Sequence, residues 1–180
     1  PAAYVTLFGL LAATGLRISE ALALQLDDLN PDGLIVRETK FQKSRLVPLH
    51  ETSWRALDRY LEARSRLNTA SQSLFVSECG KPLGYNTVAN VFRTLACETG
   101  LREKNGHHGP RIHDLRHTFA VRSIERCAGN PNAIRRHMAA LSTYLGHAHV
   151  SDTYWYLQAT PELLRQIAAA GEELHAGGTS

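Results

Sequence analysis

The sequence contains a His-x-x-Arg pattern, His113 to Arg116, shortly after Pro110. The surrounding residues predict the beginning of a helix, and residues three apart lie on one helical face. An arginine guanidinium is always charged and presents a planar fork of donors that matches two phosphate oxygens. A histidine imidazole can donate a hydrogen bond or transfer a proton near neutral pH. The pair is therefore suited to chemistry at a phosphodiester, although a solvated helix face with a partly buried histidine would give the same pattern.

Four further patterns place cationic or phenolic side chains beside predicted turns and helix ends. In chain order, their residues are Arg17 with Glu20, Lys40 with Lys43, His147, and Tyr156. Arg17 follows Gly15, whose left-handed conformation would close the preceding helix. His147 completes a Leu-Gly-His pattern at a predicted helix end, and Tyr156 follows it by nine residues. Taken singly, each pattern also fits ordinary surface charges or, for the tyrosine, packing in the core.

In their order and types, the five patterns resemble those of the tyrosine recombinase (phage integrase) family, and the resemblance extends from about Leu10 to Pro161. It implies that the chain is the C-terminal catalytic domain of such an enzyme, without the family's N-terminal core-binding domain. The catalytic residues that it implies are Arg17, Lys40, His113, Arg116, His147 and Tyr156. Glu20 resembles an acidic residue that often follows the first arginine, as a supporting contact rather than a catalyst.

The chemistry implied by the resemblance agrees with these residue types. A phosphodiester transition state carries excess negative charge, which two guanidinium forks and histidine donors would stabilise. A tyrosine phenol has a reference pKa of about 10, and neighbouring cations lower that pKa and favour the nucleophilic phenolate. Its attack yields a covalent phosphotyrosine, and a lysine ammonium can protonate the departing 5′-oxygen. Because side chains supply the positive charge, we expect no metal ion and no other cofactor.

Two assignments stay open within the resemblance. Lys43 competes with Lys40 for the role of the hairpin lysine, because the register of a short hairpin is easily misread. Tyr154 precedes Tyr156 by two residues, and side chains two apart on a helix point about 200° away from each other. Only one of the two tyrosines can then face a site, and the family spacing from His147 selects Tyr156.

Pairs of histidines offer a different interpretation, as metal ligands. His113 and His117 are four residues apart, and His147 and His149 are close in sequence. No glutamate follows His113 in the zinc-protease pattern, however, and no third ligand is evident. An unrelated metal hydrolase is therefore the least favoured class.

The composition is that of an ordinary globular protein. The chain has 180 residues, enough for one domain with a proper core, and 43% of them are hydrophobic. A formal net charge of +3 permits a nucleic-acid partner without requiring one. Three widely spaced cysteines without a Cys-x-x-Cys pattern argue against a disulfide framework and favour a reducing compartment. No apolar run approaches the roughly 18 residues of a membrane span, so we expect no membrane partner. Together with the reducing compartment that the cysteines favour, the implied recombinase function leads us to expect a cytoplasmic, nucleoid-associated protein.

Hydrophobic periodicity and turn residues predict the elements that position these side chains. The predicted helices cover residues 4–14, 18–26, 51–66, 86–98, 113 to about 122 or 126, 132–145 and 161–174. The predicted short strands cover residues 34–38, 45–49 and 74–77. We therefore expect an α+β fold that is mainly α-helical, with a small three-stranded antiparallel sheet, as the resemblance to tyrosine recombinase catalytic domains also implies. Residues 1–180 should form a single catalytic domain with a disordered tail over residues 175–180.

The resulting hypothesis is a site-specific recombinase or integrase that acts on double-stranded DNA. A type IB topoisomerase would share every catalytic residue, and the Leu-Gly-His pattern and the short hairpin favour the recombinase over it. The intact set of six candidate residues argues against a DNA-binding remnant with an idle site. The predicted last helix carries an apolar stripe formed by Leu163, Leu164, Ile167 and Ala168. This stripe either packs on its own domain or, as the resemblance implies, docks on a neighbouring protomer. We expect a monomer in free solution and a homo-tetramer on DNA.

Overall fold

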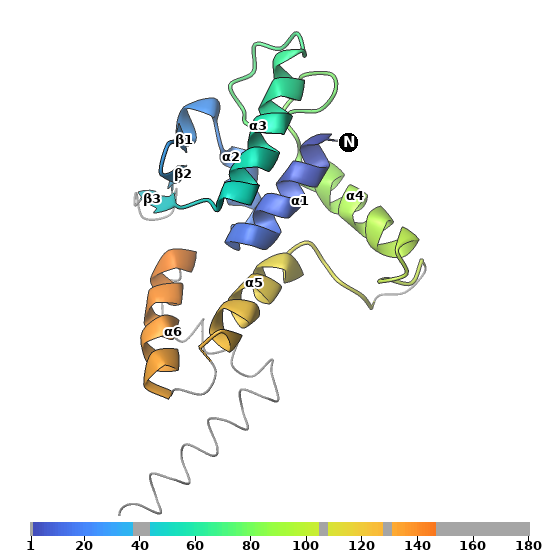
Figure 1. Ribbon diagram of the computed structural model, residues 1–180. Coiled ribbons are helices and arrows are strands. Elements are labelled where there is room, and N and C mark those ends of the chain that lie inside the picture. The colour runs from blue at the N-terminus through green and yellow to red at the C-terminus, as the bar shows by residue number, and fades with distance from the viewer. Residues whose placement is uncertain (1, 38–43, 105–107, 128–130, 147–180) are drawn as a thin grey trace, which may run out of the picture. The chain divides into compact units, whose positions relative to one another are not determined.

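The computed structural model of the protein describes residues 2–37, 44–104, 108–127 and 131–146 (Figure 1). It divides into two compact units, Pro1–Arg116 and His117–Ser180. In chain order the elements are α1 (Ala2–Thr14), α2 (Ile18–Ala23), the 3₁₀ helix η1 (Leu26–Asp28), β1 (Leu29–Asn30), β2 (Gly33–Arg37), β3 (Ser44–Val47), α3 (Glu51–Ser65), α4 (Tyr85–Glu98), α5 (Asp114–Glu125) and α6 (Pro131–Leu145). These elements confirm the predicted α+β fold, which is mainly helical with a small three-stranded antiparallel sheet.

The core of the first unit forms where α1 packs against α3. Leu7 and Leu11 of α1 and Leu57 of α3 are almost fully buried. Phe8 of α1 meets Phe92 of α4 edge to face, with ring centroids 5.4 Å apart. Burial of apolar surface is the dominant favourable term in folding. These contacts therefore fix α1, whose C-terminal end leads into the first of the predicted site patterns.

The sheet has the strand order β1-β2-β3, and both neighbouring pairs are antiparallel. An Asn-Pro-Asp-Gly turn over residues 30–33 joins β1 to β2, and in it the Asp32 N–H donates to Asn30 Oδ1 at 3.0 Å. Val36 of β2 is paired with Arg45 of β3. Residues 38–43, which follow β2 and precede β3, lie outside the described residues. The structure thus describes the two strands of the predicted hairpin but not its tip.

One predicted strand and the end of one predicted helix are wrong, and both errors have one cause. The third strand of the sheet is β1 rather than the predicted segment 74–77, and the helix that begins at Ile18 ends early, at Ala23. Leu24 is extended, and its carbonyl accepts the Leu74 N–H at 2.8 Å. The residues after Ala23 therefore leave the helix and pair with the segment before Leu74 in an isolated antiparallel bridge, between Gln25 and Ser73. Neither segment joins the three-stranded sheet there. A short apolar run does not reveal such a distant partner.

The buried segment around Leu74 takes further hydrogen bonds from side chains of α3. The Tyr60 hydroxyl donates to the Leu74 carbonyl and accepts the Val76 N–H, both at 3.0 Å. One turn later, Arg64 Nη2 donates to the Ser73 carbonyl at 2.9 Å. Burial raises the pKa of Tyr60 above its ordinary value of 10, so the hydroxyl keeps the proton that it donates. Because unpaired buried backbone groups are costly, these two side chains take the place of a neighbouring strand.

The second unit contains the rest of α5, from His117, together with α6. Its core residues on these two helices are Ala120, Ile124, Ile134, Met138, Leu141 and Leu145. The Phe119 and Tyr144 rings stack with centroids 5.7 Å apart, and Ser123 Oγ lies 2.8 Å from His137 Nε2. These contacts join the two helices. The predicted helix over residues 161–174 lies outside the described residues.

Replacing Tyr60 with phenylalanine should lower the free energy of unfolding by about 1–3 kcal/mol, the cost of leaving buried polar groups without a partner. The ring should stay stacked on Phe75, whose centroid is 5.4 Å away, so packing is preserved. Tyr85→Phe is the matched control because Tyr85 is 54% exposed, and it should change stability by less than about 0.5 kcal/mol. Urea unfolding followed by circular dichroism measures both. Equal effects would contradict the role assigned to Tyr60.

Candidate active site

The turn between α1 and α2 carries the first predicted catalytic arginine. Gly15 has a φ of 64°, a left-handed conformation that favours glycine, and its N–H donates to the Leu11 carbonyl at 2.9 Å. The buried Thr14 hydroxyl donates to a carbonyl of α1 at 2.6 Å and accepts the Leu16 N–H at 3.4 Å. The direction in which the chain leaves α1 is therefore fixed, and Arg17 follows as the N-cap residue of α2.

Arg116, the second predicted catalytic arginine, reaches the same turn from 101 positions further along the chain. Its Nη1 donates to the Gly15 carbonyl at 2.8 Å, and the residue is only 2% exposed. A buried guanidinium is costly unless it is paired. The Gly15 carbonyl lies just beyond the C-terminal end of α1, where the helix dipole is negative and favours a cation. The structure therefore brings Arg116 to the carbonyl that lies two residues before Arg17.

Glu20 of α2 accepts three hydrogen bonds. Its Oε2 accepts the Arg17 backbone N–H at 2.8 Å, and its Oε1 accepts Nη1 of the Arg17 side chain at 2.9 Å. Oε2 also accepts Nη2 of Arg45, in β3, at 2.9 Å. The side chains of Arg17, Glu20 and Arg45 are 37%, 11% and 16% exposed. Glu20 thus holds Arg17 at both its backbone and its side chain, and it connects Arg17 to the sheet.

The charges of this cluster do not cancel. Burial raises the pKa of Glu20, but the hydrogen bonds from Arg45 and the Arg17 backbone, and the nearby Arg45 charge, outweigh it and hold that pKa below its ordinary value of 4.5. Glu20 is therefore ionised at neutral pH, so one carboxylate faces two guanidinium groups. The three side chains carry a net positive charge with Arg17 partly exposed, which suits an anionic phosphate.

His113 lies one residue before α5, because the helix begins at Asp114. The Asp114 carboxylate accepts the Arg111 N–H at 2.8 Å, which fixes this beginning, and the His113 carbonyl accepts the Arg116 N–H at 3.1 Å. His113 is exposed, whereas Arg116 is buried. The two side chains of the His-x-x-Arg pattern therefore differ in their exposure to solvent.

Several of the predicted site residues lie outside the described residues. They are Lys40, its competitor Lys43, His147 and Tyr156. Their positions and roles stay predictions. Within the described ranges, no three His, Cys, Asp or Glu side chains are grouped so that they could hold a metal ion. The same part of the chain contains no helix with the length and hydrophobicity of a membrane span.

The sequence patterns do not single out Arg45, although the structure places it in this cluster. Once the register of the hairpin is known, the strand partner of Arg45 indicates that its side chain faces inward. Arg45 lies directly opposite Val36, and residues paired in this way lie on the same face of a sheet. Val36 is buried. An arginine opposite a buried valine should therefore have an inward-facing partner of opposite charge, and that partner is Glu20.

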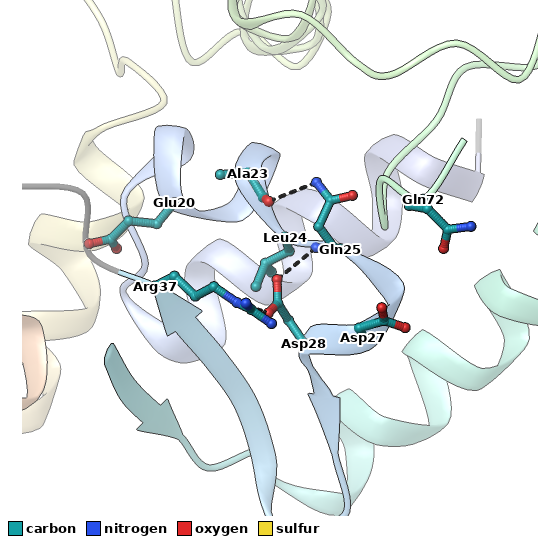
Figure 2. Close-up of a pocket in the computed structure, with 8 residues that line it drawn as sticks. All are labelled: Glu20, Ala23, Leu24, Gln25, Asp27, Asp28, Arg37 and Gln72. Carbon is teal, nitrogen blue, oxygen red and sulfur yellow. Dashed lines mark hydrogen bonds and ion pairs between the residues drawn. The ribbon is translucent and has the colours of Figure 1, made fainter. Parts of the chain in front are cut away.

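A cavity lies beside α2, and its charged lining residues are Glu20, Asp27, Asp28 and Arg37 (Figure 2). Arg37 Nε donates to Asp28 Oδ1 at 2.6 Å, and the Gln25 N–H donates to the other oxygen of the same carboxylate at 2.9 Å. The three predicted catalytic residues that the structure describes, Arg17, His113 and Arg116, do not line this cavity. We therefore place the candidate site at the arginine cluster rather than in the cavity.

Replacing Glu20 with glutamine should destabilise the protein at neutral pH but much less at low pH. Folding lowers the Glu20 pKa below 4.5, so ionised Glu20 contributes stability above that value and the contribution is lost as the pH falls through the lowered pKa. At lower pH, the protonated carboxyl and the amide are both neutral. The difference in unfolding free energy between wild type and Glu20→Gln, measured in urea from about pH 7 to about pH 3, should shrink with falling pH. A difference independent of pH would refute an ionised Glu20.

Comparison with known proteins assigns this chain to a family. The sequence profile described as the phage integrase family matches residues 1–162. The integrase/recombinase y4rB of Sinorhizobium fredii (strain NBRC 101917 / NGR234) is 43% identical over 171 residues, which cover 92% of this chain and 54% of that protein. Tyrosine recombinase XerC of Histophilus somni (strain 2336) is 31% identical, with 88% and 50% covered. The chain thus spans about half the length of the curated relatives it matches.

Solved structures agree with the sequence comparison. The crystal structure of XerA recombinase has a TM-score of 0.73 and 27% identity to this chain, covering 94% of this chain and 56% of the other. XerH site-specific recombinase, bound to palindromic difH substrate in a post-cleavage complex, has a TM-score of 0.72 and 25% identity, with 95% and 46% covered. The resemblance carried by the five patterns is confirmed: the chain belongs to the phage integrase family, and its fold is that of a tyrosine recombinase catalytic domain.

Proposed function

We propose that this chain is the catalytic domain of a site-specific recombinase or integrase, an enzyme that cuts DNA strands at defined sites and rejoins them. Its membership in the phage integrase family supports this. The relatives y4rB and XerC are named as an integrase/recombinase and a tyrosine recombinase, and XerH is bound to its palindromic difH substrate in a post-cleavage complex. The Tn1549 transposon integrase is in complex with circular intermediate DNA. The partner that we propose is accordingly double-stranded DNA.

The observation that carries the proposal is that one turn carries Arg17 and binds Arg116. Arg116 donates to the Gly15 carbonyl, and Arg17 is the N-cap residue of α2 two residues later. Positioned cations of this kind stabilise the charge that develops on the oxygens of a phosphoryl group during its transfer. A guanidinium carries five N–H donors, so the bond to Gly15 is compatible with contacts to a phosphate. We assign this role to both arginines, with His113 and His147 as further donors.

In the proposed reaction, the phenolate oxygen of Tyr156 attacks the phosphorus of the scissile phosphodiester. The bond between that oxygen and phosphorus forms as the bond to the 5′-oxygen breaks, so the 3′ end of the strand becomes linked to the enzyme. Lys40, or Lys43 in its place, donates the proton that the departing oxygen needs. A 5′-hydroxyl then attacks the phosphotyrosine and releases Tyr156. The number of phosphodiester bonds is conserved, so the reaction consumes no nucleotide.

Two other activities fit the same residues. A type IB topoisomerase would form the same covalent link, and a DNA-binding remnant would form none. The names of the relatives favour recombination over relaxation of supercoils. A covalent adduct separates an active enzyme from an idle remnant, and exchange of strands between two duplexes separates a recombinase from a topoisomerase.

Replacing Tyr156 with phenylalanine should abolish the covalent adduct between protein and DNA, because it removes the one oxygen that attacks phosphorus. Tyr154→Phe, two residues earlier, is the matched control and should form the adduct at the wild-type level. Denaturing electrophoresis after incubation of the full-length protein with candidate attachment DNA detects the adduct. A mobility shift measures DNA affinity, which neither change should alter.

Either of two outcomes would overturn this assignment. An adduct formed by Tyr156→Phe but not by Tyr154→Phe would move the nucleophile to Tyr154. The absence of an adduct with wild-type protein on every attachment DNA, despite DNA binding, would indicate the idle remnant.

We further propose that the full-length protein is a cytoplasmic, nucleoid-associated monomer that assembles into a homo-tetramer on DNA. The apolar stripe of residues 161–174 supports docking on a neighbouring protomer, and one exchanged helix buries too little surface to hold a free oligomer. Sedimentation should show tetramers only with site DNA, and a stop codon after Ala159 should prevent them. Tetramers without DNA, or unchanged assembly of the truncated protein, would contradict this arrangement.

A further inference from the structure

Two ion pairs of the same design attach the β2–β3 hairpin to the segment that contains α2 and η1. On β2, Arg37 Nε donates to Asp28 Oδ1 at 2.6 Å. On β3, Arg45 Nη2 donates to Glu20 Oε2 at 2.9 Å. Each carboxylate also accepts the backbone N–H three residues before it, at 2.9 Å for Asp28 and 2.8 Å for Glu20. Both strands of the hairpin are thus fixed to capped helix starts.

The two pairs differ in what else the carboxylate holds. Glu20 accepts Nη1 of the Arg17 side chain through Oε1 while Oε2 accepts Arg45. Asp28 instead divides its two oxygens between Arg37 and the Gln25 N–H. The side chain of Arg45 is 16% exposed and that of Arg37 is 66% exposed. The hairpin is therefore connected to Arg17 through Arg45 but not through the pair that Arg37 makes.

This sharing constrains the direction of the Arg17 side chain. The terminal torsion of a glutamate side chain is broad and roughly two-fold, so the direction of its carboxylate depends on the hydrogen bonds at both oxygens. Oε2 of Glu20 accepts the Arg17 backbone N–H and Arg45 Nη2, and Arg45 is the partner that ties the carboxylate to β3 while Oε1 faces the Arg17 side chain. The Arg45 charge also offsets the charge of Glu20, so that the carboxylate does not cancel the positive charge of Arg17.

We propose that Arg45 is a positioning residue: through Glu20 it sets the orientation of the Arg17 guanidinium, so that this orientation depends on strand β3. The kinetic consequence of this inference rests on the proposed recombinase function, whereas the consequence for the Arg17 side chain does not. The two consequences therefore require separate measurements. The chain offers a matched control in Arg37, which attaches the neighbouring strand of the same hairpin.

The first measurement is the side-chain Nε–Hε resonance of Arg17 in the full-length protein, assigned by its loss in Arg17→Lys. Arg45→Gln should shift or broaden this resonance, and Arg37→Gln should leave it within its wild-type linewidth. Arg45→Lys, which keeps the charge and a donor, should have a smaller effect and serves if Arg45→Gln does not fold. An Arg17 resonance unchanged in folded Arg45 variants would overturn the proposal.

The second measurement is the single-turnover rate of covalent adduct formation on DNA that the wild-type protein cleaves. Arg45→Gln should slow it about 10- to 100-fold, the scale for misplacing an intact catalytic group. Arg37→Gln should stay within about threefold of wild type. In a Glu20→Gln background, Arg45→Gln should add less than about twofold, because residues that act through a shared partner are not additive.

The outcomes separate this proposal from the proposed function. Absence of adduct with wild-type protein on every DNA would refute the recombinase function but leave the resonance of Arg17 as a test of positioning. Equal slowing by Arg37→Gln and Arg45→Gln would show that attachment of the hairpin matters in general, which would overturn a specific role for Arg45. Full additivity of Arg45→Gln with Glu20→Gln would overturn the route through Glu20.

Discussion

A buried guanidinium needs a hydrogen-bonding partner, and in this protein that need joins two distant parts of the chain. Arg116 is almost fully buried, and its Nη1 donates to the carbonyl of Gly15 at the end of α1. The leucines of α1 fix that end by packing against α3, and the left-handed conformation of Gly15 directs the chain into α2. The position of Arg17 thus depends on packing, on one glycine and on one arginine far away in sequence.

The carboxylates at the third positions of α2 and η1 perform two tasks at once. Glu20 and Asp28 each cap a short helical segment and each bind an arginine of the hairpin. Capping satisfies an N–H that has no partner within a helix, and the ion pair fixes the sheet to the same segment. Glu20 also forms an ion pair with the Arg17 side chain. One side chain therefore caps α2, attaches the sheet and contributes to the electrostatics of the candidate site.

Local signals in the sequence predict the described helices, apart from the end of α2, and the glycine that ends α1, because periodicity and turn chemistry act over a few residues. The resemblance also identifies Arg17 and Arg116 by their types. The sequence does not reveal that the segment at Leu74 pairs with Leu24, or that Arg45 joins the site. Both depend on hydrogen bonds between residues that lie far apart in the chain. The difference in exposure between His113 and Arg116 also depends on tertiary packing, which the spacing of three residues does not reveal.

Arg17 and Arg116 are proposed to act on one phosphate, and a crystal structure of the full-length protein with a bound oxyanion such as vanadate tests this most directly. We expect one anion whose oxygens lie within about 3.2 Å of nitrogen donors of both guanidinium groups. Arg116 should keep its bond to the Gly15 carbonyl in that structure. An anion bound by Arg17 alone, with Arg116 buried and out of reach, would contradict the proposed site and leave Arg116 a structural residue.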